Sequence, residues 1–178
     1  MRKLYKQLGW DFDELGLIVP ERVKGFDRLI VMADTELTFD RAFDVCSHSF
    51  PCWRHRSCDK NRKHSTKDER HPKSGVYAIW VRDSIETDSD LRGLSADDIK
   101  RDGSIRTMTA LERVVLEGIF FMETGGHLDR ECVTYCTGSR YKDRGVPGAR
   151  QDNEKFIIYW RDRSSKFPTL GPRRVIAV

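Results

Sequence analysis

Alternating apolar residues predict short β-strands at both ends of the chain. The clearest strand lies at 74–83, where both alternating sets of side chains are apolar, a pattern typical of a strand covered on both faces. Strand composition also marks 26–33, and shorter strands are expected at 132–136, 155–162 and 173–178. We expect the last of these to pair with one of the two early strands.

Helical periodicity is strongest over 109–126, where apolar residues recur three and four positions apart. Thr109 and Glu112 have the spacing of a capping box, and Gly125 and Gly126 supply a C-terminal stop. Because its apolar stripe is wide, this helix is expected at the centre of the core.

Two shorter helices are predicted before it. In "LSADDIKRDG", Ser95 precedes Asp98 by three residues, which again is capping-box spacing, and a glycine closes the segment. The segment 34–50 has helical apolar spacing, with Asp34 or Thr35 as the expected N-cap.

The order of these elements predicts an α+β fold, because strands and helices are followed by strands and long loops. Residues 1–25 are expected to form an N-terminal arm, and 26–178 a single domain. Within that domain 53–73 is predicted to be a basic loop, and the polar stretches 137–154 and 163–172 are predicted to be irregular.

The strand at 155–162 raises a question about the side that points away from the core. Its alternation predicts three residues on the core side, namely Phe156, Ile158 and Trp160. The opposite side then carries Ile157, Tyr159 and Arg161. A solvent-facing side usually carries Lys, Glu, Thr or Ser, so this side is either a binding surface or is covered by a loop or a partner chain.

Composition places the chain among globular proteins. It has 178 residues, of which 38% are hydrophobic and 10% aromatic, which suits one folded domain and argues against disorder. No stretch approaches the ~20 apolar residues that span a bilayer, and the first 20 residues lack the apolar core of a signal peptide. The expected location is therefore the cytoplasm, with no membrane span.

The net charge of +4 is concentrated in one place. Residues 53–73 hold eight Lys or Arg and three Asp or Glu, so the rest of the chain is close to neutral. This segment could bind nucleic-acid phosphates, with Trp53 stacking on a base. The alternative is a solvated basic loop.

Cysteine and histidine also gather in this part of the chain. Zinc takes four such ligands in a tetrahedron, so a structural zinc site is one interpretation. The other is a basic surface loop with buried thiols, which is favoured because the spacing is irregular and no Cys-x2-Cys pair is present. The candidate metal ligands are Cys46, His48, Cys52, His55 and Cys58.

Catalytic motifs are lacking, so we do not expect an enzyme and expect no cofactor apart from that candidate zinc. The chain has no Gly-rich phosphate loop, nucleophile elbow or His-Glu-x2-His motif. Cys132 and Cys136 fall on one side of a predicted strand, where two small core residues are favoured over a redox pair. The formylglycine-generating enzymes need a reactive cysteine pair near the C-terminus, and no cysteine follows Cys136.

The C-terminal third resembles a known family. The segments "TALERVVLEGIFFMETGGHLD", "VTYCTGSRYKDRGVP", "YWRD" and "TLGPRRVIAV" are similar to the variable proteins of diversity-generating retroelements, among small proteins of uncultivated bacteria and archaea. The resemblance implies a C-type lectin fold, with the basic Cys/His-rich segment as an insertion or N-terminal extension. The scaffold positions that it implies include Gly138, Trp160, Leu170 and Arg173.

The resemblance also implies a function. In that family a reverse transcriptase rewrites adenines near the 3′ end of the gene, mostly in AAY codons, so that a ligand-binding surface varies. Here that region would be 137–172, and its ligand an unidentified protein or other macromolecule. The positions whose residues such rewriting can produce are Tyr141, Gly145, Gly148, Arg150, Ile157, Tyr159, Arg161, Asp162, Phe167 and Thr169. Nucleic-acid binding through 46–73, with or without zinc, is the alternative function.

Overall fold

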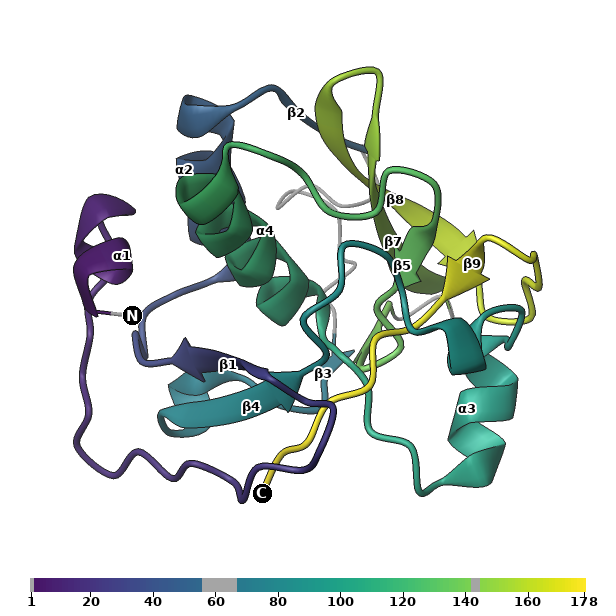
Figure 1. The fold of residues 1–178 in the computed structure, drawn as a ribbon, viewed down its shortest axis with the longest axis horizontal. Helices are drawn as coiled ribbons and strands as arrows, with labels where there is room; N and C mark the ends of the chain where they lie inside the picture. Colours follow the sequence, from purple (N-terminus) through teal and green to yellow (C-terminus); the bar gives the residue numbers. More distant parts are fainter. Residues whose placement is uncertain (1, 56–66, 142–144) are drawn as a thin grey trace.

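The computed structural model describes residues 2–55, 67–141 and 145–178, and it shows a mixed α and β fold (Figure 1). The central element is the helix α4 (Ala110–Thr124), which contacts α2 (Phe39–Ser49) and strands of two different sheets. Its residues from Ala110 to Ile119 are buried without a break. The α+β prediction and the central position predicted for this helix are both confirmed.

A two-stranded ribbon forms one side of the core. The strands β1 (Arg28–Met32) and β4 (Tyr77–Val81) pair antiparallel, with Ile30 opposite Ile79. The C-terminal segment joins β4, because the backbones of Trp80 and Ile176 exchange hydrogen bonds of 3.0 and 2.9 Å. The predicted pairing of the chain's last apolar segment with an early strand is therefore confirmed, although it is a single bridge and not a regular strand.

A five-stranded mixed sheet forms the other side, in the order β2-β8-β7-β5-β9. Its centre is an antiparallel hairpin, and a shorter parallel strand lies at each edge. The hairpin turn has positive φ at both Asn153 and Glu154, as in turns whose twist matches that of the flanking strands. The strands are β2 (Cys52–Arg54), β5 (Val133–Tyr135), β7 (Gly145–Asp152), β8 (Lys155–Asp162) and β9 (Leu170–Gly171).

Three segments predicted to be irregular contain strands, and in 163–172 the strand is the two-residue β9. In the predicted basic loop, β2 and the two-residue β3 (Lys67–Asp68) are present, and β3 pairs with β6 (Ser139–Arg140). The segment 137–154 contains β7, whose sequence "GVPGARQD" has two glycines and a proline and little apolar alternation. Its neighbours β5 and β8 supply the pairing that its own sequence does not signal.

The predicted helix boundaries are largely confirmed. Both capping boxes form, at Ser95 before α3 (Ala96–Asp102) and at Thr109 before α4, and the glycines Gly103 and Gly125 adopt the left-handed conformation at the C-termini. Among the described residues, the other helical segments are α1 (Arg2–Gln7) and the 3₁₀ turns Pro72–Ser74 and Ser89–Leu91.

The predicted N-cap of α2 was wrong, because Thr38 caps that helix. The carboxylate of Asp34 instead accepts hydrogen bonds from the backbone N–H groups of Glu36 (2.9 Å) and Asp11 (3.1 Å). Asp34 thus ties the N-terminal segment to the domain and does not start the helix.

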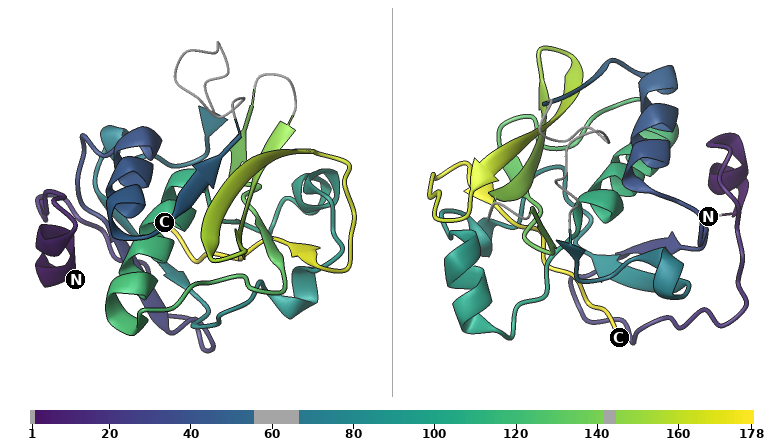
Figure 2. Two further views of the ribbon diagram at one scale, coloured as in Figure 1. Left: turned by 90° about the horizontal axis from the view of Figure 1, so that it is seen from above. Right: turned by 180° about the vertical axis from the view of Figure 1, so that it is seen from behind.

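The N-terminal segment packs against the core, as the two views of Figure 2 show for α1. Tyr5, Leu8 and Trp10 are all buried. A Cβ added at Gly118 of α4 would lie 3.2 Å from the Cys46 sulfur and 3.5 Å from the Trp10 ring. Glycine at this position therefore lets α2 and the N-terminal segment approach the central helix closely.

A fully buried ionic network joins the central helix to the C-terminal segment. Asp129 accepts hydrogen bonds from Arg113 of α4 at 2.8 and 3.0 Å and from Arg173 at 2.6 Å. Arg113 also pairs with Glu117 at 2.7 Å, and Arg173 also donates to the backbone oxygens of Ser84 and Ile85. No helix among the described residues is long and apolar enough to cross a membrane.

We expect Arg173→Met to lower the free energy of unfolding by about 3–5 kcal/mol, because it removes one partner of a buried ion pair while nearly preserving volume. Arg101→Met is the matched control, since the Arg101 side chain is 76% exposed in its pair with Asp98, and it should cost less than about 1 kcal/mol. Urea unfolding of both variants measures the difference. Equal costs would contradict a structural role for the network.

Candidate functional site

One side of the five-stranded sheet brings together several of the residues singled out in the sequence. In the register of β7 and β8, Arg150 lies opposite Ile157, and Trp53 of β2 also lies opposite Ile157. Residues in such positions share a face of the sheet. Phe156 and Ile158 project to the other face and are 0% and 1% exposed in the main core, so this first face points away from the main core.

We call this surface the outer sheet face. It consists of Trp53, Arg150, Ile157, Tyr159 and Arg161, together with Phe167 from the loop after β8. Trp53 and Phe167 are each 48% exposed, and the other four side chains are partly exposed.

The centre of the outer sheet face is a stack of a cation and two rings. The guanidinium carbon of Arg161 lies 4.9 Å from the centre of the Tyr159 ring and 5.5 Å from that of Phe167, distances at which cation–π attraction operates. Tyr159 packs in turn against the small buried cluster that includes Val133 and Leu170. The stack is therefore anchored on the sheet.

The charges around this stack are mostly paired. Arg163 pairs with Asp97 at 2.6 Å and Lys166 with Asp98 at 2.7 Å, which attaches the loop to the start of α3. Arg161 makes no ion pair with any residue in the described ranges. Its positive charge therefore interacts with the two aromatic rings and with solvent, and it is accessible to a ligand.

Three of the predicted contact positions are buried, although Gly148 lies opposite Tyr159 on the same side of the sheet. Tyr141 is only 6% exposed. Gly145 is buried beneath the indole of Trp160, because an added Cβ would lie 1.5 Å from its Nε1 atom. Gly148 lies beneath the Tyr159 ring, 3.4 Å from an added Cβ. The variable-contact role of these positions stays a prediction; Tyr141 and Gly145 are covered in this structure, whereas a Cβ at Gly148 would be in ordinary van der Waals contact with Tyr159.

The two remaining predicted contact positions lie beside the outer sheet face. Asp162 is exposed, but alternation turns it toward the opposite side of β8. Its carboxylate accepts from the Ser164 backbone (2.9 Å) and hydroxyl (2.6 Å), and these bonds lower the pKa of Asp162. Thr169 is exposed just before β9, and its backbone oxygen accepts from Val133 N–H at 2.8 Å.

The predicted scaffold residues behave differently from one another. Leu170 and Arg173 are buried, and an added Cβ at Gly138 would lie 2.6 Å from the Thr107 backbone oxygen, which only glycine avoids. Trp160 was expected to face the core but is 36% exposed. It shares the face of Ile158 but lies beyond the edge of the core, over Gly145.

The candidate zinc ligands do not come together in the part of the chain that the structure describes. There, no group of three or more His, Cys, Asp or Glu side chains is placed to hold a metal ion. Cys46 is fully buried, and burial raises its pKa; burial raises the pKa of Cys52 to about 12. Nδ1 of the exposed His48 bonds the Asp44 carbonyl, and Cys58 lies outside the described residues.

The basic segment is partly used within the fold. Arg54 pairs with Asp40 at 2.6 Å and lies over the Phe43 ring. Residues 56–66, which carry much of its charge, lie outside the described ranges. Nucleic-acid binding through this segment stays a prediction.

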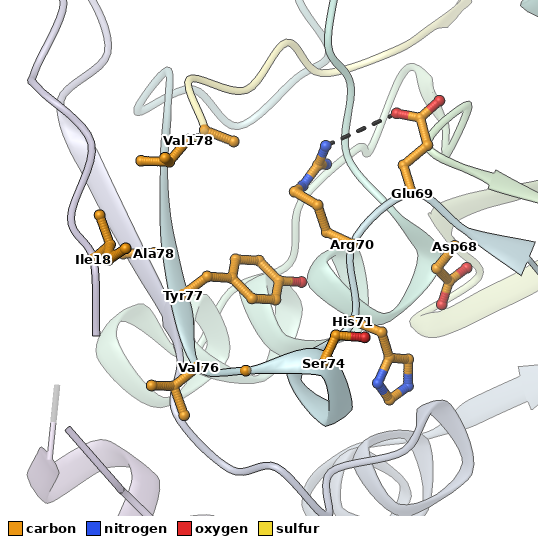
Figure 3. A pocket seen from close by; sticks show the side chains of 12 residues that line it. Ile18, Asp68, Glu69, Arg70, His71, Ser74, Val76, Tyr77, Ala78 and Val178 are labelled. Atoms are coloured by element: carbon orange, nitrogen blue, oxygen red, sulfur yellow. Dashed lines mark ion pairs between the residues drawn. The ribbon is translucent and has the colours of Figure 1, made fainter. Parts of the chain in front are cut away.

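Sequence reasoning missed a pocket of about 300 Å³ between β4 and the segment after β3 (Figure 3). One wall is polar and the other is apolar. Its residues come from separate parts of the chain, so no linear motif marks it. The polar wall consists of Asp68, Glu69, Arg70, His71, Ser74 and Tyr77, and the apolar wall includes Ile18, Val76, Ala78 and Val178.

Glu112, the capping-box residue of α4, organises the polar wall from behind. Its two carboxylate oxygens accept from Nε and Nη2 of Arg70, both at 3.0 Å, and from the Tyr77 hydroxyl at 2.9 Å. The Thr109 backbone N–H completes the set at 2.7 Å. Burial and the nearby Glu112 charge raise the pKa of Tyr77, so its hydroxyl stays protonated.

Asp68 is a partly buried carboxylate of the pocket that has no ion pair among the described residues. It accepts a hydrogen bond from the Ser139 hydroxyl, which itself accepts from the N–H of Ala110. Burial raises the pKa of Asp68 to about 6, against a smaller lowering by the Ser139 bond.

Searches among family models, curated proteins and solved structures found no match to this chain.

We expect Asp68→Asn to be more stable than the natural chain at pH 7 and nearly equal to it at pH 4. The folded-state pKa is above the unfolded value of 3.8, so the folded state binds more protons between about pH 4 and 6 and loses stability as pH rises through that window. Two pKa units correspond to about 1–3 kcal/mol.

Urea unfolding at a series of pH values measures this difference. Asp90→Asn is the control, and its effect on stability should have the opposite sign. Arg82 lowers the pKa of exposed Asp90, so the stabilisation by the Asp90 carboxylate is lost as pH falls. A pH-independent difference between Asp68→Asn and the natural chain would contradict the environment described for Asp68.

Proposed function

We propose that this chain is a non-enzymatic binding protein of the C-type lectin kind, whose outer sheet face is varied by a diversity-generating retroelement so that it contacts different macromolecular targets. The observation that carries the proposal is the position of five predicted contact residues. Arg150, Ile157, Tyr159, Arg161 and Phe167 lie on or beside one exposed surface, although they were selected only by sequence position and residue type.

The arrangement of the fold supports the proposal. The resemblance leads us to expect three features, and each has a counterpart here. They are a ribbon that includes the C-terminal segment, two packed helices, and a half rich in strands and loops that carries the outer sheet face. The outer sheet face lies on a sheet whose other side is packed against α4. A rigid support of this kind allows exposed side chains to vary without changing the fold.

The side chains of the outer sheet face also suit contact with a macromolecule. Tyr, Trp and Arg are enriched at binding hot spots because they offer large contact area and polar reach. Here a tryptophan and a phenylalanine that are each about half exposed flank Tyr159 and Arg161. Arg161 has no ion-pair partner among the described residues, so a bound ligand can use its charge.

The direct test is to sequence the 3′ third of this gene across its source population. We expect substitutions confined to the first two bases of the codons for Arg150, Ile157, Tyr159, Arg161 and Phe167, where an AAY codon carries its adenines. The codons for buried Gly145 should stay constant, because any side chain there collides with Trp160. A uniform population, or changes without regard to base, would contradict the proposal.

A second test uses two neighbouring isoleucines that face opposite ways. Ile157→Ala should cost less than about 1 kcal/mol of unfolding free energy, because the side chain lies on the outer sheet face. Ile158→Ala should cost about 2–5 kcal/mol, because that side chain is 1% exposed in the core. Similar large costs would mean that the outer sheet face is itself part of a buried interface and not free to vary. Chemical unfolding measures both.

A further inference from the structure

We propose that the pocket between β4 and the segment after β3 binds a primary alkylammonium group, with the cation at Asp68 and the alkyl chain against the apolar wall. This inference does not depend on the outer sheet face, whose residues do not line the pocket.

The shape of the pocket suits a small amphiphilic ligand. Its volume of about 300 Å³ is at the lower end of small-molecule sites. Figure 3 shows the side chains of Ile18, Val76 and Val178 on one side, and those of Asp68 and His71 on the other. Tyr77 lies between them and exposes an aromatic ring to the same space.

The charge in the pocket favours a cation. Arg70 is the cation of its polar wall, but buried Glu112 neutralises it through two hydrogen bonds of 3.0 Å, and a third bond of 2.6 Å goes to the Thr107 backbone oxygen. Burial and the Lys73 charge lower the pKa of His71, so His71 is neutral at pH 7. Glu69 also lies 3.9 Å from Arg70, as the dashed line in Figure 3 shows. One arginine thus faces the three carboxylates of Glu112, Glu69 and Asp68, so the polar wall keeps an excess of negative charge.

The hydrogen-bonding capacity of the wall points the same way. One oxygen of Asp68 accepts from the Ser139 hydroxyl, and the other accepts no hydrogen bond from any residue within the described ranges. The Tyr77 hydroxyl donates its proton to Glu112, so it presents only lone pairs to a ligand. Two acceptors, with no unpaired cation among the described residues that line the pocket, suit an ammonium group, which only donates hydrogen bonds.

The apolar wall determines the chemistry of the part of the ligand that is attached to the ammonium group. Aliphatic side chains line it, so an alkyl chain is buried there more favourably than a polar one. The same ammonium group is carried by a free alkylamine and by a lysine side chain of a peptide. Two probes distinguish these sources, namely n-pentylamine and Nα-acetyl-lysine N-methylamide.

The test is a titration of the full chain, labelled with ¹⁵N, at pH 7.5 with amide shifts as the readout. We expect saturable shifts at residues 68–78 with n-pentylamine, and at least tenfold weaker binding of pentan-1-ol and pentanoate. Tighter binding of the lysine derivative than of n-pentylamine would assign the group to a peptide side chain, and the reverse to a free amine; both results support the site.

Asp68→Asn should weaken n-pentylamine binding at least tenfold, because it removes the charge and keeps the shape. Asp90→Asn, at an exposed carboxylate outside the pocket, is the matched control and should leave affinity unchanged. Equal affinity for pentan-1-ol and n-pentylamine, or full affinity in Asp68→Asn, would overturn the proposal.

A measurement on the natural chain avoids any effect of the substitution on folding. Between pH 7.5 and pH 5 the affinity for n-pentylamine should fall roughly tenfold, because Asp68 becomes protonated while the amine stays charged. His71 also gains charge on acidification, so the profile is repeated in His71→Gln, where the loss should persist. A flat profile in both proteins would overturn the assignment to Asp68.

Discussion

The buried carboxylate of Asp129 holds the two halves of this fold together. It receives hydrogen bonds from Arg113 of the central helix and from Arg173 of the C-terminal segment, and all three side chains are inaccessible to water. A buried charge without a partner lowers the stability of the folded state. Arg113 and Arg173 are therefore stable in the core only when the segment that carries Asp129 is packed against both of them. Thr134 of β5 also donates to Asp129 and accepts from Arg173. Helix, sheet and C-terminus are thereby fixed to one another.

The outer sheet face depends on this arrangement through the opposite side of the same strand. Phe156 is held in the core between the Arg113 guanidinium, 5.2 Å from its ring centre, and the rings of Phe43 and Phe50. Because side chains alternate along β8, fixing Phe156 and Ile158 inward forces Ile157 and Tyr159 outward. These side chains therefore have a defined position outside the main core, and Tyr159 is held further by the small buried cluster that includes Val133 and Leu170.

Sequence reasoning predicted the elements whose signals are local. Two capping boxes, at Ser95 and Thr109, depend on residues close together in the chain, and both form in the structure. The alternation in β8 is likewise a local signal, and that strand is present. β7 was missed because its strand state comes from its neighbours and not from its own glycines and proline. Trp160 was placed in the core because alternation gives the side of a strand but not where the core ends along it.

The pocket shows why a correct local signal can be incomplete. Glu112 was identified as the third residue of a capping box, and it does accept from the Thr109 N–H. The same carboxylate also binds Arg70 and Tyr77, which lie 42 and 35 residues away in the sequence. These long-range bonds pair the charge of Arg70 and engage the hydroxyl proton of Tyr77, so neither is available to a ligand. Within the part of the chain that the structure describes, one oxygen of Asp68 is then left without a hydrogen-bond donor. The charge of the pocket is therefore set by the fold and not by any sequence motif.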